Sequence, residues 1–168
     1  MTRTREIRRA AQTDAAAIRD VARESWHAAY DDLLGSDTVD AVVDDWYAID
    51  RLRSAIGASS HHVFVAGEVV GFGHASPWEG APDVAHLTRL YVHPAFWGDG
   101  VGSHLLEHLD AALAGEGYER LRLEVFAEND VGVGFYESRG FDRLETIEEE
   151  FLGETYDVAV YGRPIGSE

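Results

Sequence analysis

The sequence predicts an α/β fold in which a mixed sheet of about seven strands is flanked by about four helices. Three observations carry this prediction. Segments of alternating apolar residues are interleaved with amphipathic stretches in the order βααβββαβαββ. Glycine, proline and capping residues stand at the boundaries between these segments. The 168 residues contain no repeat, low-complexity stretch or linker, so we expect one domain spanning 1–168.

The first part of the chain after a short strand is expected to be helical. The strand covers 7–10, and Thr13-Asp14 then precede a helix over 15–30 whose apolar residues recur on one face. A second helix is expected over 37–56, because apolar residues recur there at helical spacing. Gly57 would end it.

Strand patterns follow. Two strands, 62–66 and 69–74, flank Gly67-Glu68, a pair of residues typical of a two-residue hairpin turn. A longer strand over 84–93 stops at Pro94. The remaining elements are a helix over 101–113, a strand over 121–126, a short helix between Asn129 and Gly140, and two paired strands over 141–152 and 154–163.

Charge restricts the class of partner. The chain has 31 acidic against 14 basic residues, a net charge of −17, and every cation is arginine. Such a balance argues against nucleic acid as a partner, because phosphate backbones attract Lys and Arg. Acidic residues dispersed along a lysine-free chain favour adaptation to high internal salt, and an acidic mesophilic protein is the alternative.

Composition also indicates the compartment. No apolar run approaches the roughly 20 residues of a membrane-spanning helix, and no apolar segment follows the basic amino terminus. The chain has no cysteine, which excludes disulfides and thiolate metal sites. We therefore expect a cytoplasmic protein without a membrane partner.

The most informative segment joins the strand over 84–93 to the following helix. Three glycines stand at this junction: Gly98, Gly100 and Gly102. Glycines let backbone N–H groups point at one place, and a helix N-terminus adds partial positive charge there. The segment therefore predicts an anion site built from backbone, although it lacks the complete pattern of a P-loop or a dinucleotide site.

Two motifs resemble those of the GNAT acetyltransferases. Val92, Pro94, Gly100 and Gly102 match the V-x-P segment and the [QR]-x-x-G-x-[GA] signature that follows it in that family. A second match, at the family's usual distance, consists of Asn129, Gly132, Phe135, Tyr136, Glu137, Gly140 and Phe141. The resemblance implies a GNAT-like fold and acetyl transfer from acetyl-CoA to a primary amine by direct attack. It covers about 84–141, and the element order agrees along the whole chain.

The resemblance also implies the residues that bind the cofactor. These are Leu90, Tyr91, Val92, Trp97, Gly98, Asp99, Gly100, Val101, Gly102, Ser103, Asn129, Gly132, Phe135 and Arg139. Arg139 would contact the 3′-phosphate, or it would simply be a cation at a helix end. Three positions depart from the family: Trp97 replaces Gln or Arg, Asp99 replaces a frequent cation, and Gly132 replaces Ala. Gly132 and the nearby Gly134 would each cost the helix roughly 1 kcal/mol relative to Ala.

The chemistry would need an acid for the leaving thiolate and a way to remove a proton from the amine. Tyr136 stands at the family's acid position, and the Val92 N–H at the position that polarises the thioester carbonyl. His86 is one candidate base, on a strand whose alternation would put 84, 86, 88, 90 and 92 on one face. Glu124 is the rival, and a chain of waters is the third possibility.

The acceptor side is expected at the first helices and the nearby loops. Trp26, Tyr30 and Trp78 are aromatic, and Asp31 and Asp32 follow closely. Aromatic and acidic side chains suit a cationic amine or a peptide amine. Packing between helices explains Trp26 equally well.

Two other function classes compete with this interpretation. The segment His104-Leu105-Leu106-Glu107-His108 matches an inverted zinc-protease motif, but the apolar stripe of its helix directs His104 away from the core. We expect no metal site. A non-catalytic acyl-CoA sensor or scaffold is the other class, which Trp97 and Asp99 would allow. A homodimer formed through the last two strands is also open.

Overall fold

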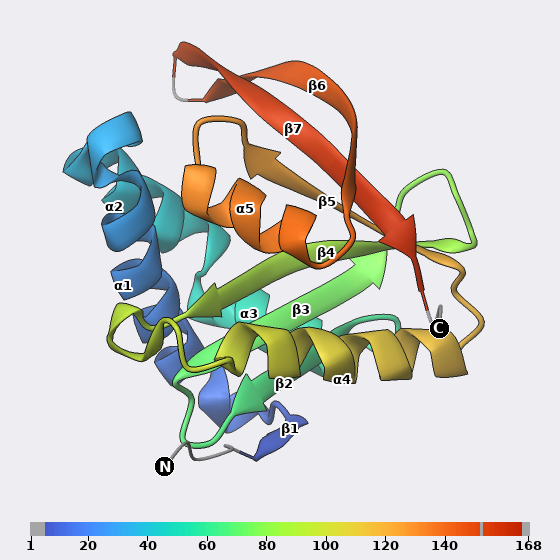
Figure 1. Cartoon of the computed structure of the whole chain (residues 1–168). Coiled ribbons are helices and arrows are strands. Elements are labelled where there is room, and N and C mark those ends of the chain that lie inside the picture. The colour runs from blue at the N-terminus through green and yellow to red at the C-terminus, as the bar shows by residue number, and fades with distance from the viewer. Residues whose placement is uncertain (1–5, 152, 166–168) are drawn as a thin grey trace.

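The computed structural model describes residues 6–151 and 153–165 (Figure 1). A single mixed sheet has the strand order β1-β2-β3-β4-β5-β7-β6, which confirms the predicted fold class. The strands are β1 (Ile7–Arg9), β2 (His62–Ala66), β3 (Gly71–Pro77), β4 (Val84–Val92), β5 (Arg120–Phe126), β6 (Asp142–Phe151) and β7 (Glu154–Pro164). The helices are α1 (Ala15–Leu34), α2 (Ser36–Trp46), α3 (Ile49–Gly57), α4 (Val101–Gly115) and α5 (Asp130–Ser138), with short 3-10 turns at Gln12–Asp14 and Pro94–Phe96.

Strands β4 and β5 are the parallel neighbours in an otherwise antiparallel sheet. Helix α4 makes the crossover between them. Their pairing covers only 84–86 of β4 and 120–122 of β5, although both strands continue beyond it. The two strands therefore diverge, and their carboxyl-terminal halves leave a gap in the middle of the sheet.

Helices cover both faces of the sheet. Helices α1, α2 and α3 lie on one face, and α4 and α5 lie on the other (Figure 1). The first core packs α1–α3 against alternate residues of β2 and β3, including Val63, Val65 and Phe72. The second core packs α4 against the intervening residues and against β5, including Phe64, Leu121 and Leu123. The period-2 alternation of the strands thus feeds two separate cores.

The helix predicted over 37–56 is wrong as one element, because the structure divides it into α2 and α3. The break lies at Tyr47, which is 1% exposed and accepts a hydrogen bond from Trp26 Nε1 at 3.1 Å. The Trp46 carbonyl accepts from Arg89 Nη2 at 2.8 Å. That carbonyl would have continued the helical ladder, so a contact distant in sequence ends α2.

The two-residue hairpin at Gly67-Glu68 is also wrong. Ala66 pairs with Gly71, so the connection contains four residues, 67–70. Val69 has a φ of 70° and is 9% exposed, which means that its side chain is buried at the cost of an unfavourable backbone conformation. The apolar character of Val69 therefore reflects packing in the first core.

The ends of other elements differ slightly from the predicted ones. Helix α1 continues to Leu34, and Gly35 follows with a φ of 89°. Strand β6 begins at Asp142, one residue after the predicted start, and the predicted end at position 152 lies outside the described residues. Gly140 has the predicted left-handed conformation after α5, with a φ of 86°.

Candidate active site

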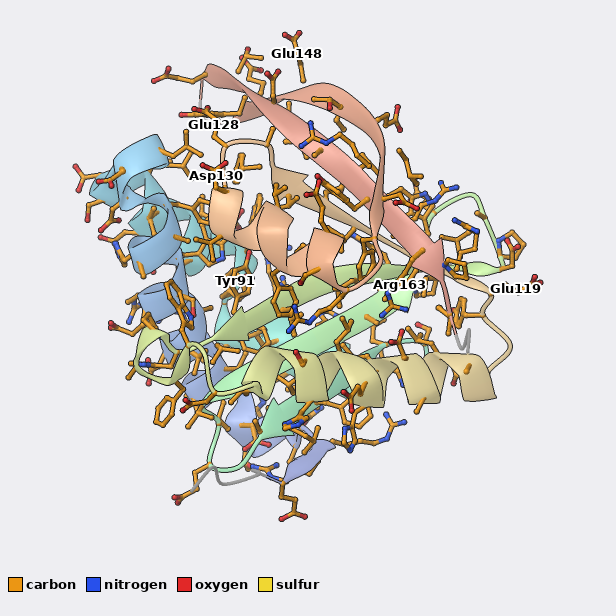
Figure 2. All side chains as sticks on the ribbon, viewed as in Figure 1. Tyr91, Glu119, Glu128, Asp130, Glu148 and Arg163 are labelled. Atoms are coloured by element: carbon orange, nitrogen blue, oxygen red, sulfur yellow. The ribbon has the colours of Figure 1, made fainter. Side chains whose placement is uncertain are left out.

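A cavity of about 860 Å³ occupies the gap between β4 and β5. Its walls come from α1, the carboxyl-terminal half of β4, the segment from Phe96 to Ser103, the end of β5, and α5. Tyr91, labelled in Figure 2, is one of the β4 residues that line it. The cavity therefore gathers the two motif segments that the sequence separates by about 30 residues.

A bulge in β4 decides which backbone groups face this cavity. Arg89 pairs with His74 and Leu87 pairs with Ala75, so Thr88 is an extra residue without a partner on β3. The bulge reverses the alternation, so the prediction that 84, 86, 88, 90 and 92 share one face is wrong. Ala85 and Leu87 before it, and Leu90 and Val92 after it, all pack with the second core.

Backbone N–H groups of β4 face the gap. The His93 N–H donates to the Val70 carbonyl at 2.8 Å, so 93 and 91 are hydrogen-bonding positions toward β3. Alternation then directs the N–H groups of Leu90 and Val92 away from β3. Because β5 no longer pairs at these positions, both N–H groups face the cavity. Either can donate to an acyl carbonyl.

The glycine segment ends in an open helix N-terminus. Gly98 and Gly100 have φ values of 86° and 83°, which only glycine adopts readily. The first hydrogen bond of α4 joins the His104 N–H to the Gly100 carbonyl, so the N–H groups of 101–103 precede the helical ladder. Among the described residues no side chain caps this end. The donors and the helix dipole suit a phosphate group.

Trp97 and Asp99, the two residues of this segment that differ from the GNAT signature, lie differently relative to the cavity. The Trp97 indole lines the cavity, and its Nε1 donates to the Val92 carbonyl at 2.7 Å. Asp99 is exposed and does not line the cavity, so its carboxylate is kept out of the place where phosphate would lie. The backbone donors of the segment thus remain available despite the acidic residue.

The second motif joins α5 to its surroundings. Asn129 Oδ1 accepts from the Gly132 N–H at 3.0 Å, and its Nδ2 donates to the Tyr30 hydroxyl at 2.9 Å. A Cβ at Gly132 would lie 2.7 Å from that Nδ2 atom. A Cβ at Gly102 would lie 3.2 Å from the Phe135 ring, so this glycine lets α4 and α5 approach each other. Both glycines therefore have packing roles.

Tyr136 lies on α5 with its side chain along the cavity. Its ring packs edge-on against Phe135 and Phe141, at centroid distances of 5.2 and 5.5 Å. Burial raises the pKa of the Tyr136 phenol well above its usual value of 10.0. The phenol is consequently protonated at neutral pH and can act only as a proton donor there.

The two candidate bases lie beside each other. His86 Nε2 is 3.6 Å from Glu124 Oε1, across the root of the gap. Glu124 lines the cavity, whereas His86 is behind it, with its ring edge-on to Trp78 at 5.1 Å. The contact with His86 lowers the pKa of Glu124 below its usual 4.5, so the carboxylate is ionised at neutral pH.

Arg139 lies at the carboxyl end of α5 and lines the cavity beside the start of α4. Its guanidinium stacks over the Phe135 ring at 3.7 Å, and its Nε donates to Ser103 Oγ at 3.0 Å. A second nitrogen, Nη2, also contacts Ser103 Oγ. The cation is thereby held close to the open N–H groups of α4.

The three aromatic residues predicted to bind the acceptor lie in different parts of the structure. Tyr30 lines the cavity, and burial raises the pKa of its phenol to about 12. Trp26 is 3% exposed in the first core and does not line the cavity. Trp78 contacts His86 and the Arg122 guanidinium, away from the cavity wall. Of the three aromatic residues, only Tyr30 borders the space.

Three exposed carboxylates lie at one end of the cavity: Asp32, which the sequence already places on the acceptor side, and Glu128 and Asp130, which sequence reasoning does not single out. The hydrogen bond between Tyr30 and Asn129 brings the end of α1 beside the start of α5, which gathers them. Figure 2 labels Glu128 and Asp130 at this end of α5. For Glu128 and Asp130 the available signal is that they flank Asn129 of the second motif, but acidic residues are common along the whole chain.

The described part of the chain contains no group of three His, Asp or Glu side chains placed to hold a metal ion. His104 and His108 lie one turn apart on α4, and His108 Nδ1 contacts the His104 carbonyl at 3.0 Å. No described helix is long and apolar enough to cross a membrane.

Comparison with known proteins agrees with this geometry. The sequence profile of the "Acetyltransferase (GNAT) family" matches residues 15–141. A spermidine N(1)-acetyltransferase of Thermoplasma acidophilum is 26% identical over 156 residues, covering 89% of this chain and 95% of that protein. A phosphinothricin N-acetyltransferase of Streptomyces coelicolor is 33% identical over 119 residues, covering 68% of this chain and 66% of that protein.

A solved structure shares the fold. The PaiA N-acetyltransferase of Thermoplasma acidophilum, determined in complex with coenzyme A, superposes with a TM-score of 0.82. It is 24% identical, and the match covers 96% of this chain and 99% of that chain. With the family profile extending over both motifs and both walls of the cavity, this chain belongs to the GNAT family and is an N-acetyltransferase that uses acetyl-CoA as its cosubstrate.

Proposed function

We propose that the enzyme acetylates a small amine that carries more than one positive charge. The observation that carries this proposal is the set of carboxylates along the cavity: Asp32, Glu124, Glu128 and Asp130. Ammonium groups are attracted to such a surface, and an acidic phosphinate or carboxylate substrate is repelled by it.

The cations of the cavity do not reverse this preference. Arg139 lies beside the α4 N-terminus, at the other end of α5 from Asp130. Arg89 also borders the cavity, but its Nη2 donates to the Trp46 carbonyl and its Nη1 contacts His74 Nδ1. Both guanidinium groups therefore have partners away from the acidic end, which leaves that end negative.

The residues fit acetyl-CoA in the opposite part of the cavity. When bound, this cosubstrate supplies an activated acetyl thioester and a pyrophosphate group. The N–H groups of 101–103 are open toward an anion, and Arg139 adds a positive charge next to them. Leu90 and Val92 would donate their N–H groups to the thioester carbonyl, where negative charge develops during attack.

Proton movement would use two separate groups. Glu124 is an ionised carboxylate at the cavity wall and would accept the ammonium proton, directly or through a water molecule. His86 would position Glu124 from behind. Tyr136 would donate its phenolic proton to the leaving thiolate.

A panel of acceptors tests the proposal, with release of free thiol as the readout. The cysteine-free chain adds no background to this assay. The expected order of kcat/KM is spermidine and diaminoalkanes first, then a monoamine of equal length, then peptide N-termini and phosphinothricin. Preference for phosphinothricin or for a neutral peptide would contradict the polycationic acceptor.

We further propose that the acidic surface adapts the protein to a cytoplasm of high ionic strength. At about 1 M salt the Debye length is about 3 Å, so repulsion among surface carboxylates is largely screened.

Residues 1–168 would act as one domain, because one sheet contains all the strands β1 to β7. β6 ends the strand order, so a homodimer would form by pairing of β6, which light scattering in high salt would test.

A further inference from the structure

The residue at the family's Gln or Arg position makes an unexpected contact. Trp97 Nε1 donates to the Val92 carbonyl at 2.7 Å, and Ser25 Oγ of α1 donates to the same oxygen at 2.8 Å. One carbonyl at the end of β4 therefore accepts from α1 and from the loop that precedes α4. Neither donor belongs to the sheet.

The sheet itself leaves the polar groups of Val92 without partners. Position 92 faces away from β3, and the pairing with β5 has ended six residues earlier, at His86. Hydrogen bonds from outside the sheet must therefore orient the Val92 backbone. Ser25 is 2% exposed on a buried face of α1 and is fixed by its helix, whereas Trp97 belongs to a glycine-rich loop.

The backbone hydrogen bonds of the loop itself close turns within it: the Trp97 N–H donates to the Pro94 carbonyl at 3.3 Å and the Asp99 N–H to the Phe96 carbonyl at 3.4 Å. Gly98, directly after Trp97, and Gly100 both have positive φ, and a Cβ at Gly98 would meet nothing within 4 Å. Chain freedom at these glycines would let the loop shift relative to β4. The indole hydrogen bond joins Trp97, which shortly precedes α4, to Val92 at the end of β4. It therefore connects the segment that leads to the N–H groups of 101–103 with the strand that carries the N–H groups of Leu90 and Val92.

We propose that Trp97 is a positioning residue for acetyl-CoA. Its indole N–H sets the position of the pyrophosphate-binding N–H groups of α4 relative to the N–H groups of Leu90 and Val92 that face the thioester. This role rests on the proposed placement of acetyl-CoA in the cavity. It also explains how the loop works without the polar side chain that the family usually has at this place.

The test compares W97F, which keeps an aromatic ring and removes the N–H, with S25A, which removes the other donor to the same carbonyl. Calorimetry would measure the Kd of coenzyme A, and thiol release would measure kcat and the KM of acetyl-CoA. For W97F we expect the Kd of coenzyme A and the KM of acetyl-CoA to rise about 3- to 10-fold, which corresponds to the net contribution of one hydrogen bond. The kcat should change less than 2-fold.

S25A should separate the two roles. Loss of its buried hydroxyl should lower the Tm more than W97F does, because Trp97 is 47% exposed. Its effect on the Kd of coenzyme A should be smaller than that of W97F, because α1 does not carry the pyrophosphate donors. Equal effects of the two variants on Kd would contradict loop positioning.

A truncated cosubstrate sharpens the test. S-acetylpantetheine lacks the pyrophosphate, so W97F should lose less activity with it than with acetyl-CoA, each measured relative to the wild type. Unchanged or tighter binding of coenzyme A by W97F would overturn the positioning role alone, and tighter binding would mean that the indole obstructs the site. Failure of the wild type to bind coenzyme A would overturn the placement of acetyl-CoA and this role together.

Discussion

His86 Nε2 and Glu124 Oε1 lie 3.6 Å apart, on neighbouring strands that pair at His86 and separate beyond it. The two side chains that the sequence offers as rival bases are thus neighbours, and they can act together. Glu124 borders the cavity, and His86 stands behind it.

This relationship predicts a shift in the pH–rate profile. His86 lowers the pKa of Glu124 below 4.5, so the wild type should retain its base down to acidic pH. H86Q should raise that pKa and move the acid limb of kcat/KM to higher pH, while E124Q should lower kcat/KM about 100-fold. Disappearance of the acid limb in H86Q, with E124Q active, would make His86 the base.

The same pair affects stability. A carboxyl whose folded pKa is lowered contributes stability above its unfolded pKa, and this contribution is lost as the pH falls through the folded pKa. The difference in Tm between wild type and H86Q should therefore shrink on acidification below the ordinary pKa of Glu124. A constant difference from pH 7 to pH 3 would show that the contact with Glu124 is not its source.

Tyr136 should affect turnover and not cosubstrate binding. We expect Y136F to lower kcat about 10- to 100-fold and to leave the KM of acetyl-CoA within about 2-fold, because a phenyl ring fills the same space without donating a proton. Y118F, a variant of a half-buried tyrosine beside α4 and outside the cavity, is the matched control. Equal kinetics of Y136F and wild type would exclude the acid role.

Two glycines of α5 should respond oppositely to alanine. A Cβ at Gly134 would meet nothing within 4 Å, so G134A should stabilise the protein by roughly 1 kcal/mol. A Cβ at Gly132 would displace the Asn129 amide, so G132A should destabilise it by about 1 kcal/mol through loss of the cap. Urea denaturation would measure both, and stabilisation by G132A would mean that Asn129 can move without loss.

The acidic end of the cavity should control the acceptor. D32N and E128Q should each raise the KM for a polycationic amine about 3- to 10-fold at low salt, with the KM of acetyl-CoA unchanged. D20N, which removes an exposed carboxylate of α1 outside the cavity, should change neither constant. If D20N matched the other two variants, the effect would come from net charge and not from the site.

Salt should stabilise the fold. With a net charge of −17, we expect the Tm to rise steadily between dilute buffer and about 2 M KCl, because screening reduces repulsion among carboxylates. The measurement is thermal unfolding followed by circular dichroism, with sucrose as the control for general exclusion effects. A Tm that is independent of KCl would exclude the proposed adaptation to high salt.

Apart from the division of 37–56 into α2 and α3, the sequence by itself determined the order of the elements. It also determined the helix N-terminus after Gly100 and the two motifs that line one cavity. Those features depend on residues close together in the chain: period-2 and helical patterns, glycines of positive φ, and the Asn129 cap. Their physical causes are local, so a reading of neighbouring residues can find them.

Only the tertiary structure decided the features that join distant segments. The bulge at Thr88 follows from pairing with β3, the end of α2 follows from Tyr47 burial and the Arg89 contact, and the acidic end of the cavity follows from the Tyr30–Asn129 bond. The Trp97 contact with Val92 likewise needs the final path of the loop. Each of these features depends on contacts between atoms that are distant in the sequence, and the spacing of residues along the chain does not indicate which of them meet.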